Sequence, residues 1–478
     1  MGYKTGVDKK QLSFLPPSLD EYVPENHICR LISAFTGLLD MATLGYKYAK
    51  CKSTGCRPYD PRMMLNLYIY GYLHRVRSSR CLRDEAIKNV EVMWLMEGLR
   101  PDDKTICNFR KDNLKTLKET FKEFVRMCHG LGLYGGEVVA TDSTKIRANN
   151  SLSNSHNPTT VNNTLLRIDK KISEYLNALD QGDLEGEEQP GSGEIKAALE
   201  RLRARKERYE VLKSRLENGE SEVSTVDPDS RIMRTGGDGR KLDVCFNVQT
   251  VVDSKNHLVV DFEVSGCASD AGNLKAMSDK AMEMLDVKTI TNLADTGYYD
   301  SQDIAACELR GVTCLVAKPT PGGPKKADGF NHRDFIYDRE KDVYICPCKK
   351  ELKYMRSWKH NSGREYRAYT NTPACTKCEK KALCTTTKYR EVLRQTCQDV
   401  LDCVDERTRK NKGLYRKRQE IVEHVFGTVK AVWGYKQFLC RTKPKVTAET
   451  ALAYLAYNIR RVFNILAESG DRLAPAIR

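Results

Sequence analysis

The order of predicted strands and helices between residues 137 and 318 limits the fold of this chain more than any other feature. EVVATDSTKI predicts a short apolar strand, KLDVCFNVQTVVD alternates apolar and polar residues as a half-buried strand does, and HLVVDFEVS predicts a third strand after a hairpin turn at Lys255 and Asn256. SDAGNLKAMSDKAMEML then predicts a helix, VKTITNLAD a strand, DSQDIAACELRG a helix and VTCLVAK a strand. The chain therefore predicts three strands in a meander followed by helix, strand, helix and strand.

That order is typical of an α/β fold with a ribonuclease-H-like mixed sheet core, which we expect within residues 136–478. Two insertions interrupt this predicted core. Residues 160–225 are charged and helical, with a seven-residue apolar repeat at Ile195, Leu202, Tyr209 and Leu216, and because Arg205 breaks the offset row we expect a helical hairpin. Residues 319–405 form the second insertion, which carries a cluster of cysteines.

Residues 1–135 predict a separate helical domain. RMMLNLYIYGYLHRV follows Pro61, which suits the first turn of a helix, and shorter helical segments come after it. We expect Arg110, Lys111 and Lys115 to be exposed in a module resembling a helix-turn-helix, which makes this a candidate DNA-binding domain. A helical packing domain without DNA contacts fits the same pattern.

The charge of the chain favours a polyanionic partner. The formal net charge is +15, and twelve Lys or Arg residues but only two acids lie between Arg407 and Lys445. Charge alone leaves a nucleic-acid function open, because many basic proteins bind nucleic acid only incidentally. The first residues, MGYKTGVDKKQLSFLPP, have no apolar signal region, and the longest apolar stretch, Met63 to Leu73, is too short to span a bilayer. We expect a soluble cytoplasmic protein without a membrane partner.

Three acids have positions that fit a shared metal site. Asp142 lies at the end of the first predicted strand and Asp295 at the end of the fourth, and these strands are neighbours in a ribonuclease-H-like sheet. Glu423 lies on the predicted helix RQEIVEHVFGTVKAVW. Three converging carboxylates repel one another unless a cation binds them, and Mg²⁺ or Mn²⁺ prefers such oxygen ligands. Two such ions about 3.5–4 Å apart can stabilise the attacking and leaving oxygens of a phosphodiester displacement.

Each acid also has a structural alternative. Asp142 could cap the turn that begins at Ser143, Asp295 could do the same for TGYYD, and Glu423 could pair with a base on an exposed helix face. Asp227 and Asp229 are rivals for the second acid, although DPDS is more typical of a turn that leads into the second strand. The joint placement of the three acids favours the metal site.

Nearly the whole chain resembles the insertion-sequence transposases of the DDE superfamily, in the group with a helical amino-terminal domain and a cysteine-bearing insertion before the glutamate. In that group the first acid follows the first strand, the second precedes a Gly-Tyr pair, and the glutamate precedes a lysine by seven positions, which matches Asp142, Asp295, Glu423 and Lys430. The resemblance is carried by PYDPRMMLNLYIYGYL, RSSRCLRDEA, PDDKTICNFR, ATDSTKIRANNS, DPDSRIMR, FNVQTVVD, ADTGYYDSQDI and YRKRQEIVEHVFGTVK.

The resemblance implies metal-dependent DNA cleavage and strand transfer. The implied partners are the terminal inverted repeats of a transposon and target DNA, bound by a homodimer or higher multimer, with Tyr415, Arg418 and Lys430 holding the transposon-end phosphates. A salt-bridged helix face is the alternative for these three residues. An inactive, domesticated DNA-binding relative and a nuclease without strand transfer are the alternatives for the function.

One spacing departs from the family pattern. Many relatives have Tyr-x2-Arg-x3-Glu-x6-Lys, whereas four residues separate Arg418 from Glu423 here. The stricter spacing falls on Val422, which cannot bind a metal, and the other nearby acid, Glu420, has no lysine seven positions later. Glu423 is therefore the predicted third acid.

The cysteine cluster predicts a structural zinc site. Cys375 and Cys378 have the spacing of a zinc-binding pair, and Cys346 and Cys348 could supply the other two ligands, with Cys384 spare. Reduced cysteines without a metal are the alternative. Zinc bound there would stabilise the insertion and would take no part in the chemistry.

Overall fold

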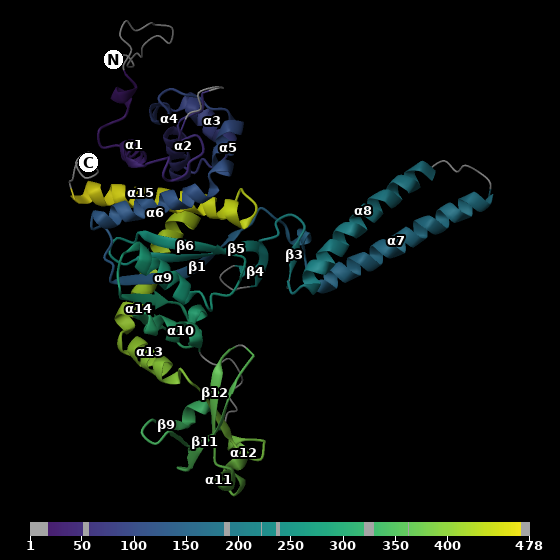
Figure 1. The fold of residues 1–478 in the computed structure, drawn as a ribbon, viewed down its shortest axis with the longest axis vertical. Helices are drawn as coiled ribbons and strands as arrows, with labels where there is room; N and C mark the ends of the chain where they lie inside the picture. The colour runs from purple at the N-terminus through teal and green to yellow at the C-terminus, as the bar shows by residue number, and fades with distance from the viewer. Residues whose placement is uncertain are drawn as a thin grey trace, which may run out of the picture.

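The computed structural model describes residues 18–50, 57–185, 192–220, 222–235, 240–319, 329–361 and 363–469. The central sheet lies between the amino-terminal helices on one side and the cysteine-bearing insertion on the other, and a long helical hairpin projects sideways (Figure 1). Within the described ranges no helix is long and apolar enough to cross a membrane. The amino-terminal segment in which no signal region was predicted, residues 1–17, lies outside these ranges.

The central sheet is mixed and has the predicted neighbours. The strand order is β4-β5-β1-β7-β8. β6 also pairs directly with β5, along the stretch that follows the one paired with β4. β1 runs antiparallel to β5 and parallel to β7, and β7 is parallel to β8. This mixed α/β arrangement is consistent with a ribonuclease-H-like core. The strands are β1 (Val138–Arg147), β4 (Arg231–Thr235), β5 (Lys241–Asp253), β6 (Val259–Ser265), β7 (Ile290–Ala294) and β8 (Val312–Val316).

Two strands differ from the prediction. β1 continues to Arg147 in place of the predicted turn, so Asp142 lies in the middle of the strand, opposite Thr250 of β5. The short strand β4 was not predicted, because the DPDS turn leads into β4 before the chain reaches β5. β1 remains extended as far as Arg147 because β5, which is thirteen residues long, offers a pairing partner along the whole of this stretch.

The helices after β6 pack on this sheet. α9 contacts β5, β6 and β7, α10 and α13 contact β8, and α14 contacts β1, β5 and β7. α14 then passes into a π-helix, η5, before the long carboxyl-terminal helix α15. The elements are α9 (Leu274–Met284), α10 (Ser301–Leu309), α13 (Gln398–Lys410), α14 (Lys412–Phe426), η5 (Gly427–Val432) and α15 (Lys443–Ser469).

The amino-terminal helices share one hydrophobic core with the rest of the chain. α15 packs against α6 and α2, and a single cluster of buried residues runs from the first helices through the central sheet to α15. The prediction that Arg110 is exposed was wrong: its guanidinium is largely buried and lies over the ring of Tyr68. Lys111 and Lys115 are exposed as predicted. The helices are α1 (Ile28–Leu38), α2 (Pro61–Leu73), α3 (Ser79–Lys88), α4 (Val90–Leu95), α5 (Asp103–Asp112) and α6 (Leu114–Gly130).

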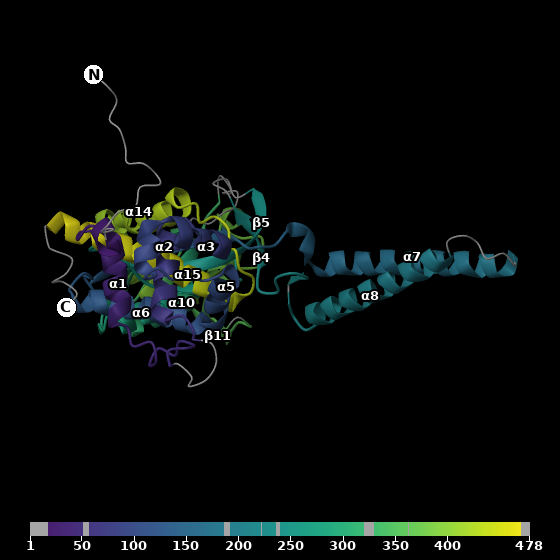
Figure 2. The same cartoon turned by 90° about the horizontal axis from the view of Figure 1, so that it is seen from above.

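The first insertion is a helical hairpin, as predicted. α7 (Pro158–Glu185) and α8 (Ser192–Glu217) pair with each other and extend away from the body of the molecule (Figure 2). A small cluster at the base of the hairpin, Val161, Leu212 and Val223, is buried. The strands β2 (Ser155–His156) and β3 (Val223–Ser224) pair there and connect the hairpin to the sheet.

The second insertion has its own five-stranded antiparallel sheet, in the order β13-β12-β11-β10-β9. Its core is a small cluster of Phe335, Tyr344, Leu352, Tyr369 and Val392. The sheet ends at Gln395, so the predicted boundary at residue 405 falls inside α13, which packs on the central sheet. The elements are β9 (Ile336–Asp338), β10 (Val343–Ile345), β11 (Glu351–Lys359), β12 (Glu365–Thr370), α11 (Thr372–Thr376), α12 (Lys381–Cys384) and β13 (Glu391–Gln395).

Candidate functional site

Asp142 and Asp295 are brought to the same level of the sheet by strand register. In the parallel pair β1 and β7, Thr141 lies opposite Ala294, so the next residue of each strand is one of the two aspartates. Asp142 is inside β1, whereas Asp295 is the residue at which β7 ends and the short helix Thr296–Tyr298 begins. The structure therefore brings together two of the three predicted acids, although 153 positions separate them in the chain.

Arg418 of α14 lies between these two carboxylates. One guanidinium nitrogen donates a hydrogen bond of 2.9 Å to Asp142, and the other lies 3.5 Å from a carboxylate oxygen of Asp295. The side chain of Arg418 is 12% exposed and that of Asp142 is 24% exposed, so their ion pair is partly shielded from water. The remaining oxygen of Asp142 accepts the backbone N–H of Ser143 at 2.7 Å.

The surroundings of Asp142 disfavour its negative charge. Burial raises the pKa of this carboxyl to about 6, against the lowering effects of the Ser143 N–H and of Arg418. The neighbouring carboxylates of Asp295 and Asp270 add to the rise in pKa. Carboxylates that repel one another in a partly buried position are a suitable oxygen ligand set for a hard divalent cation.

Asp270 is a neighbouring acid that the sequence did not predict. Its carboxylate accepts hydrogen bonds from Asn247 at 2.8 Å and from Gln249 at 2.7 Å, both side chains of β5. Gln249 in turn accepts a hydrogen bond from the buried hydroxyl of Tyr298, in the short helix that follows Asp295. Asp270 is therefore connected through Gln249 to Tyr298, in the short helix that begins directly after Asp295.

The two β5 side chains that donate to Asp270 show that one prediction was wrong. The alternation in β5 predicted one buried face and one polar face, but Asn247 and Gln249 are 0% and 1% exposed. β5 is buried on both faces over this stretch, and the two amides are satisfied in part by Asp270. Buried polar groups require partners, and Asp270 is one here, but the alternation in β5 gave no signal that the two amides are buried.

The structure does not bring Glu423 to the two aspartates. At 3.6 residues per helical turn, five residues after Arg418 correspond to a rotation of about 140° around α14. Ile421, Val422 and Val425 form the buried face of this helix, while Glu423 is exposed. Among the described residues, Asp142, Asp295 and Glu423 are not a group whose carboxylate oxygens all lie within 4.8 Å of one another.

Tyr415 and Lys430 lie on either side of Arg418 in the chain, Tyr415 in α14 and Lys430 in η5, which continues α14. Lys430, in η5, donates hydrogen bonds to the Thr144 hydroxyl at 3.1 Å and to the Lys145 carbonyl at 2.9 Å. Burial lowers the pKa of this ammonium. Tyr415 lies beside Arg418, whose guanidinium is 6.0 Å from the centre of the tyrosine ring.

A basic surface groove of about 740 Å³ adjoins Tyr415. Its lining includes Lys318, Arg409 and Lys412, together with the partly buried acid Asp405. Lys318 is paired with Asp405 at 2.8 Å, whereas Arg409 and Lys412 are exposed at the junction of α13 and α14. Val316, which also lines the groove, pairs with Ala294, the residue before Asp295, so the groove lies by the carboxyl ends of β7 and β8.

The rival acids have other roles. Asp227 accepts the backbone N–H of Thr442 at 3.2 Å, and Asp229 accepts that of Lys443 at 2.7 Å, so both hold the start of α15. Val422, on which the stricter family spacing falls, is 1% exposed in the hydrophobic core. Glu420 is exposed on α14.

All five cysteines of the predicted zinc cluster line one small cavity in the second insertion: Cys346, Cys348, Cys375, Cys378 and Cys384. Elsewhere in the described residues, His27, Cys29 and Glu91 have ligand atoms within 4.8 Å of one another. These three have structural partners, because His27 accepts the N–H of Cys29 at the start of α1 and Glu91 accepts the hydroxyl of Tyr70.

Comparisons with known families match both ends of the chain. Residues 17–112 match the family described as a transposase domain (DUF772), and residues 345–463 match the family described as a transposase DDE domain. The second match includes Arg418, Glu423 and Lys430 and begins after Asp295. No curated protein and no solved structure matches the chain. The chain therefore carries a transposase domain of the DUF772 type and a transposase DDE domain in one polypeptide.

Proposed function

We propose that this transposase hydrolyses the phosphodiester at the 3′ end of its element and uses the freed hydroxyl to attack target DNA. The DDE domain already implies transposition-related cleavage and strand transfer. The observation that carries the finer proposal is the position of Asp142 and Asp295 directly after the paired residues Thr141 and Ala294 of two parallel strands, with Arg418 between their carboxylates. Mg²⁺ or Mn²⁺ bound by these carboxylates would lower the pKa of the attacking water or hydroxyl and offset the charge that develops on the phosphate.

The chain's own residues would orient the DNA around these carboxylates. Arg409, Lys412 and Lys318 of the groove would hold phosphates close to Asp295, and Tyr415 would contact the sugar or a base at the element's end. Lys430 would fix the position of β1 beside Asp142 through its bonds to Thr144 and Lys145, while facing the same edge of the site. Arg418 would leave the aspartates when a cation binds and pair with a phosphate.

Two residues compete for the place of the third acid. Glu423 is the proposed residue because it lies in the matched DDE domain and precedes Lys430 by seven positions. Its exposed position requires a movement of α14 or of its side chain when DNA binds. Asp270 is the second candidate, since it raises the pKa of Asp142 and is attached to the same group of residues as Asp295.

The test uses the full-length chain and labelled duplexes that carry the inverted repeats flanking its open reading frame. We expect nicking in Mg²⁺ to fall at least about 100-fold in Asp142→Asn and Asp295→Asn, while retention of the duplex in a gel persists. Asp286→Asn and Glu283→Gln are matched controls, because both residues are exposed acids of the same domain. Normal nicking by either aspartate variant would remove that residue from the site.

The same assay separates the other functions. A protein that retains the duplex but never nicks it would be an inactive DNA-binding relative. Efficient nicking without products joined to a target plasmid would indicate a nuclease. We propose that two or more copies act together, since two element ends are joined in one event, and light scattering of the protein with and without the duplex measures that number.

A further inference from the structure

The far end of the second insertion contains a cavity of about 40 Å³ whose lining includes five cysteines. Cys346 and Cys348 lie in the turn between β10 and β11, Cys375 and Cys378 lie at the end of α11, and Cys384 ends α12. Cysteines that are separated by up to 38 positions in the chain therefore line one small space. A space of this size holds an ion or a few water molecules.

The thiols have the geometry expected around a tetrahedral metal on at least one edge. The sulfurs of Cys348 and Cys378 are 3.8 Å apart, and ligands at about 2.3 Å from a tetrahedral zinc ion are separated by about 3.8 Å. Cys346 accepts the backbone N–H of Lys350 at 3.3 Å, which stabilises a thiolate at that position. No three of the five sulfurs lie within 4.8 Å of one another, so a bound ion would draw the two turns inward.

The charges around the cavity suit a thiolate cluster. Its lining includes Lys350, Lys381 and Arg390 and no acidic side chain. One zinc ion with four thiolates carries a net charge of −2, and the cations would offset this charge. If the thiols were neutral, these three cations would lie close to one another without a counter-charge, which disfavours that state.

Both turns are held by backbone bonds that keep the thiols near the cavity. Cys346 and Lys350 are joined by an N–H to carbonyl bond of 2.9 Å across the first turn. The Asn371 side chain caps α11 and also donates to the carbonyl of Glu351 at 2.7 Å, which ties the second pair of cysteines to β11. The two turns are thus both attached at the start of β11.

We propose that this cavity binds one structural zinc ion through four thiolates, those of Cys346, Cys348, Cys375 and Cys378, with Cys384 left as a thiol. The zinc site is closed by protein ligands and takes no part in DNA cleavage. It stabilises an insertion whose buried core is only a small cluster, and metal binding contributes folding free energy to such small units. The proposal is independent of the metal bound by the aspartates.

The test measures metal in the full-length protein purified under reducing conditions. We expect one zinc per chain by elemental analysis and, after exchange with Co²⁺, the intense near-ultraviolet absorption of sulfur bonded to cobalt. Single Cys→Ser variants of Cys346, Cys348, Cys375 and Cys378 should lose the zinc. Cys384→Ser should retain it.

Cys397→Ser and Cys403→Ser are the matched controls, because these cysteines follow the insertion sheet and do not line the cavity. Treatment with a zinc-selective chelator should increase proteolysis between residues 340 and 390 while gel retention of the DNA duplex continues. A protein without zinc even after reconstitution, full zinc in all five variants, or a Cys348–Cys378 disulfide found by mass spectrometry would overturn the proposal. The cobalt spectrum of the unmutated chain keeps the test decisive where a variant fails to fold.

Discussion

The guanidinium of Arg418 donates a 2.9 Å hydrogen bond to the carboxylate of Asp142, across 276 positions of the chain. A cation is therefore already present at the carboxylates to which a divalent metal is expected to bind. Arg418 and the metal would compete for the same oxygens, because a carboxylate cannot pair fully with both. The stability of the site therefore depends on whether Arg418 or a divalent metal offsets the charge of the two aspartates.

Arg418→Gln should therefore destabilise the metal-free protein and increase its response to Mg²⁺. Loss of the guanidinium leaves two partly buried carboxylates without a counter-charge, which should lower the free energy of unfolding by about 2 kcal/mol. Urea unfolding with and without Mg²⁺ measures both effects. Arg416→Gln is the control, since Arg416 is exposed on the same helix. An Mg²⁺ response equal to that of the unmutated chain would refute the competition.

Asp270→Asn and Glu423→Gln separate the two candidates for the third acid. If Glu423 supplies a metal ligand, Glu423→Gln should reduce nicking at least about 100-fold and Asp270→Asn should have a smaller effect. The amide of Asn can still accept from Gln249, so Asp270→Asn should retain the local fold. Nicking rates at saturating Mg²⁺, compared with Glu283→Gln, measure the difference. The reverse order of effects would assign the third carboxylate to Asp270.

Mg²⁺ binding should weaken as the pH falls through about 6. Burial holds the pKa of Asp142 at about 6 in the folded chain, above its ordinary value of 3.8. Between these values the folded state binds more protons than the unfolded state, so this group contributes stability at low pH and that contribution is lost as the pH rises. The metal requires the ionised carboxylate and must displace the proton below about pH 6.

The measurement is the rise in melting temperature caused by Mg²⁺, followed from about pH 5 to about pH 7.5. We expect a small rise at the lower pH and a larger one at the upper pH. Asp270→Asn removes a neighbouring negative charge while Asp142 and Asp295 both remain, so in this variant the midpoint should move to lower pH. A rise that is constant across the range would show that Asp142 does not titrate with metal binding.

The sequence predicted the architecture better than it predicted the site. Alternation in β5 and β6 and the apolar segments of β1, β7 and β8 indicated the strand order, because these signals are local and repeat over several residues. The meeting of Asp142 and Asp295 followed from that order, since neighbouring strands in known register place residues side by side. The sequence did not predict the positions of polar side chains in a strand that is buried on both faces, such as β5.

Two of the missed features have clear physical reasons. Asn247 and Gln249 were expected on a polar face, but helices and neighbouring strands cover both sides of β5, which no local period can show. Arg110 was expected to be exposed, but its long side chain folds over Tyr68. Glu423 differs from these, because the apolar residues of its own helix indicated the buried face, and the position of Glu423 beside that face could have been derived from the sequence.

Exposed cations at the junction of α13 and α14 should contribute to DNA affinity through phosphates. Arg409→Ala combined with Lys412→Ala should reduce the slope of log affinity against log salt by about 2, since each phosphate contact contributes about 0.9. Binding of a labelled inverted-repeat duplex over a range of salt concentrations measures the slope. Lys288 and Arg310 precede the amino-terminal ends of β7 and β8, at the sheet edge opposite Asp295, so their double alanine variant is the control. Equal slopes for both variants would place the DNA elsewhere.

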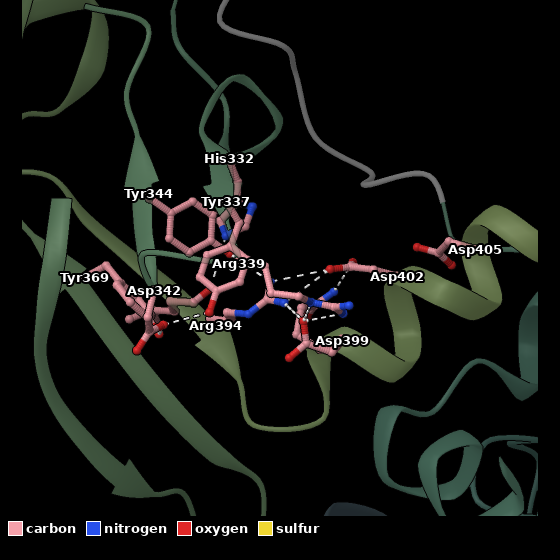
Figure 3. A network of polar contacts seen from close by, with 12 residues as sticks. His332, Tyr337, Arg339, Asp342, Tyr344, Tyr369, Arg394, Asp399, Asp402 and Asp405 are labelled. Atoms are coloured by element: carbon pink, nitrogen blue, oxygen red, sulfur yellow. Dashed lines mark hydrogen bonds and ion pairs between the residues drawn. The ribbon is translucent and has the colours of Figure 1, made fainter. Parts of the chain in front are cut away.

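Arg394 should anchor the second insertion to the helix that leads to the site. In the network at this junction (Figure 3), its guanidinium lies 3.7 Å from the centre of the Tyr337 ring and donates to Asp399 of α13 at 2.7 Å. Arg339 donates to the same carboxylate at 2.7 Å, but its side chain is 66% exposed whereas that of Arg394 is 5% exposed. The two arginines thus make the same contact at different burial.

Arg394→Met should lower the free energy of unfolding by about 3 kcal/mol, because it leaves Asp399 and the ring of Tyr337 without a buried partner. Arg339→Met should cost less than about 1 kcal/mol, since an exposed ion pair is screened by water. Urea unfolding measures both, and a double-mutant cycle with Asp399→Asn should give a larger coupling energy for Arg394 than for Arg339. Because α13 continues into α14, nicking should also fall in Arg394→Met, while zinc content is retained. Equal costs for the two arginine variants would mean that burial at this junction does not hold the insertion against the central sheet.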